Sequence, residues 1–169
     1  DSASDFAWNS AVKENIKVRK FDKDKDLTDF QLALKIAGEE EKEGTCIFLT
    51  GCFGGRFDHM WSTVISMLHF GCASVPLGMA DDKEGMIFLN GPACADFKFE
   101  KKPEAFSVIS FSKQCSGVNI RGTRWPLDNA SLEYSCPYSI SNRVGDEIVS
   151  VEIGEGLAGI YWEWGISCK

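Results

Sequence analysis

The chain has 169 residues, of which 44% are hydrophobic and 25% charged, and its formal net charge is −7. This length and composition are typical of one folded domain or two small ones, and they exclude a disordered chain. The acidic balance argues against a nucleic-acid partner, because phosphates are neutralised by clustered Lys and Arg. No apolar run approaches the ~20 residues that a membrane-spanning helix needs.

The seven cysteines include no C-x-x-C pair, and several lie within apolar runs. Their odd number and spacing favour buried free thiols over a disulfide framework or a zinc site. We therefore expect a reducing compartment, the cytoplasm, for this protein.

Strand-like and helix-like segments alternate in the part of the chain before Pro103. Helices are indicated by apolar side chains at the i, i+3, i+4, i+7 spacing, and buried strands by short apolar or β-branched runs. The expected segments are, in chain order, a strand at 16–21, a helix at 28–43, a strand at 46–50, a helix at 56–73, and strands at 74–79 and 86–89. This alternation predicts an α/β layer with a parallel sheet.

After Pro103 the helical spacing disappears and short β-rich runs follow one another, separated by turn residues. The expected strands lie at 106–111, 117–121, 131–134, 139–142, 148–153 and 158–164. Such a series is typical of an antiparallel sandwich or barrel.

Aspartates alternate at positions 22, 24 and 26, a pattern that suggests ligands for a hard cation. An EF-hand loop would also need Gly at position 27 and Glu at position 33. The chain has Leu27 and Ala33 there, so the EF-hand interpretation fails.

Thr28 and Asp29 follow these aspartates at the start of the expected helix. Their oxygens suit Mg²⁺ at the edge of a sheet. Thr28 and Gln31 also fit a capping box, and Asp29 in the first turn favours the helix dipole. Both interpretations stay open, because a capping hydroxyl keeps lone pairs.

Three glycines, Gly51, Gly54 and Gly55, lie between an expected strand and an expected helix, and Arg56 follows them. Glycine lets backbone N–H groups approach phosphate oxygens, and a helix N-terminus favours anions. The spacing matches neither the P-loop nor the dinucleotide fingerprint. An ordinary turn therefore remains the alternative.

Trp125 precedes Pro126 at an expected strand end, where a ring is easily left exposed. An exposed indole can stack on a planar or cationic heterocycle. The alternative is a ring that fills the sandwich core, which is also our expectation for Trp162 and Trp164, in the core or at an interface.

Four motifs together resemble the thiamine pyrophosphokinases in order and spacing, and the resemblance runs from Asp1 to Lys169. They are D-K-D-L-T-D-F at 24–30, G-x-x-G-G-R-x-D-H at 51–59, G-T-R-W-P-L at 122–127 and S-N at 141–142. The resemblance implies an N-terminal parallel α/β nucleotide-binding domain, residues 1–102, incomplete at its start. A C-terminal antiparallel β-sandwich that binds thiamine, residues 103–169, would follow it.

The implied reaction transfers pyrophosphate from ATP to the hydroxyl of thiamine, giving thiamine diphosphate and AMP, with Mg²⁺ as the metal. A homodimer with active sites shared between subunits is implied as well. The alternative is a non-catalytic fragment that binds thiamine or a partner and has an incomplete nucleotide site.

The resemblance also implies roles for individual residues. Asp1, Thr28 and Asp29 would hold the metal, and Asp29 would accept the hydroxyl proton. The ATP-binding residues would be Gly51, Gly54, Gly55, Arg56 and Asp58. The thiamine-binding residues would be Trp125, which stacks on the vitamin, and Ser141, Asn142 and Lys25.

Overall fold

The computed structural model describes residues 5–16, 18–22, 24–39, 47–70 and 77–165, which form three helices and nine strands. The helices are α1 (Asp5–Lys13), α2 (Asp29–Glu39) and α3 (Phe57–Phe70). The strands are β1 (Ile47–Leu49), β2 (Leu77–Ala80), β3 (Glu84–Asn90), β4 (Ala93–Lys98), β5 (Ala105–Ser110), β6 (Gln114–Arg121), β7 (Leu127–Glu133), β8 (Ile148–Ile153) and β9 (Leu157–Glu163).

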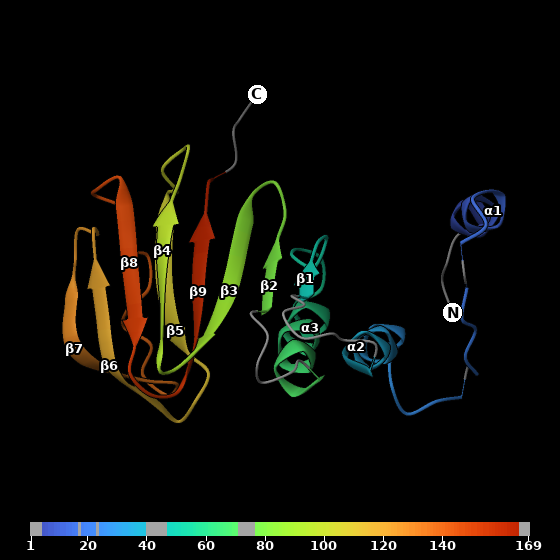
Figure 1. The fold of residues 1–169 in the computed structure, drawn as a ribbon, viewed down its shortest axis with the longest axis horizontal. Helices are drawn as coiled ribbons and strands as arrows, with labels where there is room; N and C mark the ends of the chain where they lie inside the picture. Colours follow the sequence, from blue (N-terminus) through green and yellow to red (C-terminus); the bar gives the residue numbers. More distant parts are fainter. Residues whose placement is uncertain (1–4, 17, 23, 40–46, 71–76, 166–169) are drawn as a thin grey trace.

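Five strands form a mixed sheet in the order β1-β2-β3-β9-β5 (Figure 1). β1 and β2 are parallel, and every other pair in this sheet is antiparallel. The expected parallel sheet is therefore represented by one parallel pair in the described part of the chain. The fold class is nevertheless the expected one, an α/β portion followed by an antiparallel β-sandwich.

The remaining four strands form an antiparallel sheet in the order β4-β8-β6-β7. β3 and β4 precede Pro103, yet they pair with β9 and β8 from the end of the chain. The hydrogen bonding of both sheets therefore continues across the expected boundary between residues 102 and 103, and that division stays a prediction.

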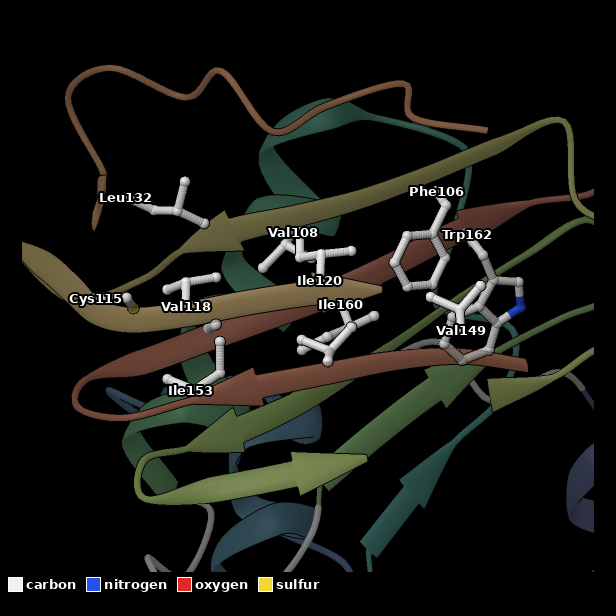
Figure 2. Close-up of a cluster of buried hydrophobic side chains, with 12 residues drawn as sticks. Phe106, Val108, Cys115, Val118, Ile120, Leu132, Val149, Ile153, Ile160 and Trp162 are labelled. Atoms are coloured by element: carbon white, nitrogen blue, oxygen red, sulfur yellow. The ribbon is translucent and has the colours of Figure 1, made fainter. Parts of the chain in front are cut away.

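The two sheets pack face to face around one hydrophobic core (Figure 2). Side chains of β5, β6, β7, β8 and β9 fill it, because alternate residues of each strand point to the same face. Its fully buried members include Phe106, Val108, Ile120, Val151 and Ile160. Trp162 lies in this core and Trp164 packs against it, as expected from the sequence.

A second core lies between helices α2 and α3 and the other face of the five-stranded sheet. Leu34 of α2 and Met67 of α3 pack there with Met86 and Phe88 of β3. Met86 and Phe88 alternate with Ile87, whose side chain packs against the first core. The five-stranded sheet is therefore the middle layer, and it fixes the helices relative to the sandwich.

Two of the expected strands are wrong. Residues 16 and 18–22 form no strand, and the side chains of Ile16, Val18 and Phe21 are exposed, so this run adds no strand to the described sheets. Residues 139–142 also form no strand, because Ser141 has a left-handed φ of 56° and only Asn142 pairs with Phe106.

Strand β4 and helix α1 were not expected from the sequence. α1 lies apart from both sheets in Figure 1, with Phe6 and Val12 exposed. None of the helices in the described residues is long and apolar enough to cross a membrane. Of the four cysteines that lie within the described residues, all are free thiols but only Cys115 is buried, which corrects the expectation of buried thiols.

Candidate functional site

Helix α2 begins with the expected capping box. The Gln31 backbone N–H donates to Thr28 Oγ1 at 3.2 Å, and the Thr28 N–H donates to Gln31 Oε1 at 3.0 Å. Gln31 Nε2 also donates to Oγ of the buried Ser66 at 3.0 Å, which joins α2 to α3. Thr28 is therefore the N-cap of α2, and its hydroxyl oxygen already accepts one hydrogen bond.

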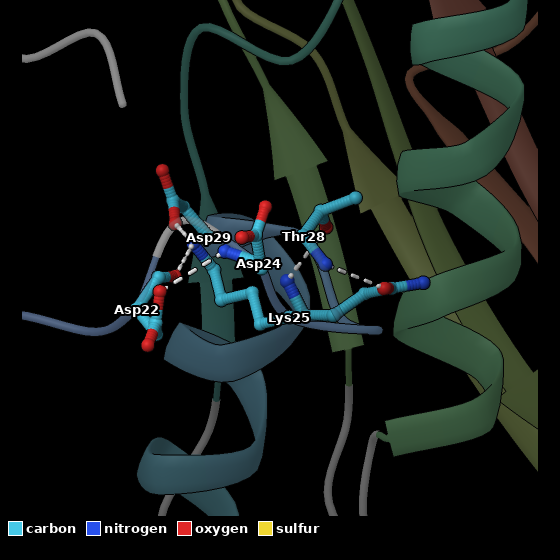
Figure 3. A network of polar contacts seen from close by, with 6 residues as sticks. Asp22, Asp24, Lys25, Thr28 and Asp29 are labelled. Carbon is cyan, nitrogen blue, oxygen red and sulfur yellow. Dashed lines mark hydrogen bonds and ion pairs between the residues drawn. The ribbon is translucent and has the colours of Figure 1, made fainter.

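The Asp29 carboxylate is paired with Lys25 one turn earlier (Figure 3). Lys25 Nζ lies 2.6 Å from Asp29 Oδ1 and donates to the backbone carbonyl of Asp22 at 3.1 Å. The ammonium of Lys25 lowers the pKa of Asp29, so Asp29 is a carboxylate at neutral pH. The structure thus brings Lys25, Thr28 and Asp29 together.

The fit of a metal ion to these residues can be tested on the geometry. In the ranges that the structure describes, no group of three or more His, Cys, Asp or Glu side chains could hold a metal ion. Asp29 already carries a lysine ammonium, and Asp1 lies outside the described residues. The assignment of Asp1, Thr28 and Asp29 to Mg²⁺ therefore stays a prediction.

The glycine loop follows β1 and leads into α3. Gly51, Gly54 and Gly55 have φ values of 69°, 82° and 71°, a conformation that other residues rarely adopt. A Cβ atom at any of the three would meet no atom within 4 Å. Backbone conformation, rather than lack of space, therefore requires glycine here, and the backbone of the loop is open to a ligand.

Arg56 and Asp58 close the loop at the N-terminus of α3. Arg56 Nε donates to Asp58 Oδ1 at 3.0 Å, and Arg56 Nη2 lies 2.5 Å from Asp58 Oδ2. Asp58 Oδ1 also accepts the backbone N–H of His59. The Arg56 guanidinium lowers the pKa of Asp58. Both side chains are exposed, so Arg56 can exchange this carboxylate for a phosphate.

Phe53 anchors the glycine loop to the second core, a role that the sequence did not indicate. Its ring meets Tyr161 of β9 edge-on, with 6.4 Å between centroids. The Tyr161 hydroxyl donates to Glu84 Oε2 at 2.6 Å, and burial together with this carboxylate raises the pKa of Tyr161. The loop therefore rests on a side chain from the end of the chain.

Trp125 lies in the connection between β6 and β7, and 53% of its surface is exposed. The interpretation of this ring as core is therefore wrong. The guanidinium carbon of Arg124 lies 4.9 Å from the centre of the ring. An exposed indole next to a cation is available for stacking.

Asn142 is 4% exposed and lies beneath the Trp125 backbone. Its Oδ1 accepts the N–H groups of Trp125 and Arg143, and its Nδ2 donates to the Trp125 carbonyl and the Thr123 hydroxyl. The neighbouring Ser141 N–H donates to Ser107 Oγ at 3.0 Å, and the Ser141 side chain is exposed.

The two groups of residues occupy opposite ends of one chain. β7, which follows Trp125, lies at one end of the long axis, and α2 and α3 lie toward the other (Figure 1). Asn142, which holds Trp125, pairs with Phe106 of β5, whereas the glycine loop follows β1 at the opposite edge of the five-stranded sheet.

Comparisons with known proteins identify both parts. The model described as "Thiamin pyrophosphokinase, catalytic domain" matches residues 1–77. The model described as "Thiamin pyrophosphokinase, vitamin B1 binding domain" matches residues 96–158. The second range contains Trp125 and Asn142, and the first contains the glycine loop.

Thiamine pyrophosphokinase of Bacillus subtilis (strain 168) is 30% identical over 121 residues, covering 72% of this chain and 55% of that protein. Thiamine pyrophosphokinase 1 of Oryza sativa subsp. japonica is 25% identical over 152 residues, covering 86% of this chain and 55% of its own length. The chain thus spans about half the length of these curated relatives.

Two solved structures show the same fold. The crystal structure of the Bacillus subtilis thiamine pyrophosphokinase has a TM-score of 0.74 at 24% identity and covers 84% of this chain and 65% of that chain. The crystal structure of yeast thiamin pyrophosphokinase has a TM-score of 0.71 at 13% identity. The match covers 96% of the present chain and 67% of the yeast chain. The chain belongs to the thiamine pyrophosphokinase family.

Proposed function

We propose that this protein transfers pyrophosphate from ATP to the hydroxyl of thiamine, giving thiamine diphosphate and AMP. The observation that carries the proposal is the exposed Trp125 indole within the segment that matches the vitamin B1 binding domain. The match of residues 1–77 to the catalytic domain supports the transfer itself.

The thiamine end of the site is built around Trp125. The aromatic rings of thiamine are flat and one is cationic, so an indole face attracts them by stacking and by cation–π interaction. Ser141 offers an exposed side chain beside the segment that Asn142 holds. We assign Trp125, Ser141 and Asn142 to thiamine binding on this basis.

The ATP end of the site is the glycine loop with Arg56 and Asp58. Backbone N–H groups at a helix N-terminus attract phosphate oxygens, and Arg56 supplies a fork of donors. Gly51, Gly54 and Gly55 have the positive φ values that keep the loop in its conformation. Pyrophosphate transfer needs mainly such positioning and charge neutralisation, which suits a glycine loop that ends in an arginine.

Asp29 is the proposed acceptor of the thiamine hydroxyl proton, and its lowered pKa keeps it ionised. Lys25 must leave the carboxylate before Asp29 can act, because their nitrogen and oxygen atoms lie 2.6 Å apart. The assignment of Lys25 to thiamine stays a prediction. A contact between the Lys25 ammonium and the cationic ring of thiamine would bring together two positive charges, which repel each other. Asp1, Thr28 and Asp29 stay the proposed ligands of Mg²⁺, the metal that family membership implies.

A homodimer would bring the two ends together. A two-fold axis that places the Trp125 end of one chain against the glycine loop of its partner also places the partner's Trp125 end against the first chain's loop. The dimer would then have two such sites. Both ends expose apolar side chains, which isolated soluble chains rarely expose in clusters. On α3 these are Phe57, Trp61 and Ile65, and in the segment that follows β7 they are Tyr134, Tyr138 and Ile140.

The test is chromatography of AMP and thiamine diphosphate after incubating the purified protein with ATP, Mg²⁺ and thiamine. We expect both products in equal amounts, and neither when thiamine is left out. Thiamine binding without AMP release would favour the alternative, a non-catalytic binding protein. Absence of both binding and release would contradict both functions.

A further inference from the structure

The amide of Asn142 uses its full hydrogen-bonding capacity inside the protein. Its oxygen accepts the Trp125 N–H at 3.1 Å and the Arg143 N–H at 2.9 Å. Its nitrogen donates to the Trp125 carbonyl at 2.7 Å and to Thr123 Oγ1 at 3.2 Å. A side-chain amide has two donor hydrogens and two acceptor lone pairs, so nothing remains for a ligand.

The position of Asn142 is itself fixed from below. Its backbone exchanges two hydrogen bonds with Phe106 of β5, at 3.0 and 2.8 Å. Phe106 is fully buried in the sandwich core, and the preceding Ser141 N–H donates to the hydroxyl of the buried Ser107. Asn142 therefore transmits the position of a rigid strand to the connection that carries Trp125.

The backbone N–H and C=O of Trp125 are both hydrogen-bonded to the Asn142 amide. The Thr123 hydroxyl donates a further hydrogen bond to the Trp125 carbonyl, at 3.3 Å. The connection therefore cannot rotate about Trp125 without breaking buried hydrogen bonds. The guanidinium of Arg124 lies 4.9 Å from the centre of the indole ring. The indole is thus held exposed, with a cation beside it.

We infer that Asn142 is a positioning residue that acts on the vitamin only through Trp125, and that it does not contact thiamine. This inference rests on the proposed function and deepens it, because it replaces direct recognition by Asn142 with a preorganised stacking surface. An aromatic surface held in its bound geometry loses less conformational freedom on binding.

A double-mutant cycle separates the two roles of Asn142. Thiamine affinity is measured by calorimetry for wild type, Trp125→Ala, Asn142→Ala and the double variant. If Asn142 acts through Trp125, Asn142→Ala weakens binding about tenfold, and it adds nothing once Trp125 is gone. If the two losses multiply in the double variant, Asn142 contacts the vitamin itself and the inference is wrong.

Asn119 provides a matched control. Its amide also links strands, accepting the Asn129 N–H at 2.7 Å and donating to Glu152 Oε2 at 3.0 Å, but it makes no contact with Trp125. Asn119→Ala should lower the melting temperature and leave thiamine affinity unchanged. A loss of affinity equal to that of Asn142→Ala would mean that both changes act through general destabilisation, which overturns the inference.

Two milder variants keep the test open if Asn142→Ala does not fold. Asn142→Asp retains the two acceptor bonds but loses both donors, and Thr123→Val removes only the hydroxyl. Each should weaken thiamine binding several-fold while ATP binding is unchanged. Unchanged thiamine affinity in both variants would contradict the inference.

A second readout does not need the vitamin. The indole N–H signal of Trp125 in a ¹H–¹⁵N NMR spectrum is assigned from its loss in Trp125→Phe. In Asn142→Asp this signal should shift and become more mobile, and in Asn119→Ala it should stay in place. If the wild-type protein binds no thiamine, the proposed function fails. If the indole N–H signal does not move in Asn142→Asp, the positioning role of Asn142 is contradicted, whether or not thiamine binds.

Discussion

Two cations of the proposed site are paired with carboxylates close in the sequence, Lys25 with Asp29 and Arg56 with Asp58. Each cation lowers the pKa of its partner. The contribution of each pair to folding is therefore fully present above the ordinary value of 3.8 and is lost as the pH falls through the lowered pKa. At neutral pH both pairs are formed, so a phosphate must compete with them.

The first prediction concerns the Asp58 carboxyl. In Arg56→Gln the pKa of Asp58 should rise back toward 3.8, because its main stabilising partner is gone. NMR titration of the ¹³C-labelled carboxyl group measures this midpoint in both proteins. Identical midpoints would show that Arg56 does not pair with Asp58 in solution. Lys98→Gln, which breaks the Lys98–Glu147 pair elsewhere, is the control and should leave the Asp58 midpoint unchanged.

The second prediction concerns Trp125. Loss of a stacked indole costs about 1–2 kcal/mol of binding to a cationic ring, roughly a fivefold to thirtyfold loss of affinity. Since more than half of the Trp125 surface is exposed, Trp125→Ala should leave the melting temperature almost unchanged. Calorimetry with thiamine and a thermal melt check both statements. A strongly destabilised variant with unaltered thiamine affinity would contradict the stacking role.

At the residue scale, sequence reasoning succeeded where partners are close along the chain. The Thr28–Gln31 cap is readable because both residues lie within one helical turn. Asn142 is assigned to thiamine binding by resemblance alone, and its hydrogen-bond partners Thr123 and Trp125 are 19 and 17 residues away. No local sequence pattern predicts contacts over such separations. The hydrogen bond between Tyr161 and Glu84, which are 77 residues apart, could not be predicted for the same reason.

At the element scale, the connection between β1 and α3 combines a fixed backbone with an anchored side chain. The positive φ values of Gly54 and Gly55 set the path of the loop, and Phe53 holds it against the second core. Within the described residues, a Cβ at Gly51, Gly54 or Gly55 would meet no atom within 4 Å, so these three positions face open space at the N-terminus of α3.

The third prediction concerns this loop. A β-branched residue at a φ of 71° costs about 1–2 kcal/mol, so Gly55→Val should move the loop rather than unfold the protein. We expect ATP to raise the melting temperature of wild type and to lose this effect in Gly55→Val. Gly145→Ala is the control, since its Cβ meets its nearest atom at 3.4 Å and its φ is not positive. Full ATP protection of a folded Gly55→Val would make the loop an ordinary turn.

Periodicity predicted helices α2 and α3 and most of the sandwich strands, because each buries one face of a regular element. It failed where tertiary partners decide the outcome. The run 16–21 is apolar enough for a strand but has no neighbour in the described sheet. β4 was missed because its residues alternate between half-buried and exposed, and its apolar residues are mostly small, two Ala and one Cys, with no β-branched side chain.

At the scale of the whole molecule, the middle sheet joins the glycine loop to the Trp125 end but also holds them apart. β1 is the outermost strand of the five-stranded sheet, and β7 is the outermost strand of the four-stranded sheet. In the proposed reaction, which uses ATP at one end and thiamine at the other, this arrangement is the reason for proposing that two chains share each site. The order of strands, which depends on pairing between residues far apart, could not be derived from the sequence motifs alone.

The fourth prediction follows from this separation. At limiting thiamine and ATP, Gly55→Val and Trp125→Ala should each be strongly impaired alone, but mixing them with subunit exchange should restore about a quarter of the wild-type rate. Half of the dimers would then be mixed, and each would carry one intact site of two. No recovery, with mixed dimers verified by mass spectrometry, would mean that each site is built from a single chain.

The transfer of an intact pyrophosphate group is tested most directly by following labelled phosphorus. ATP carrying radioactive phosphorus in either the β- or the γ-phosphate is incubated with thiamine, Mg²⁺ and the protein, and the products are separated. The predicted result is labelled thiamine diphosphate from both forms of ATP, together with unlabelled AMP. Label in ADP or free phosphate, or consumption of ATP that does not depend on thiamine, would contradict pyrophosphate transfer to the vitamin.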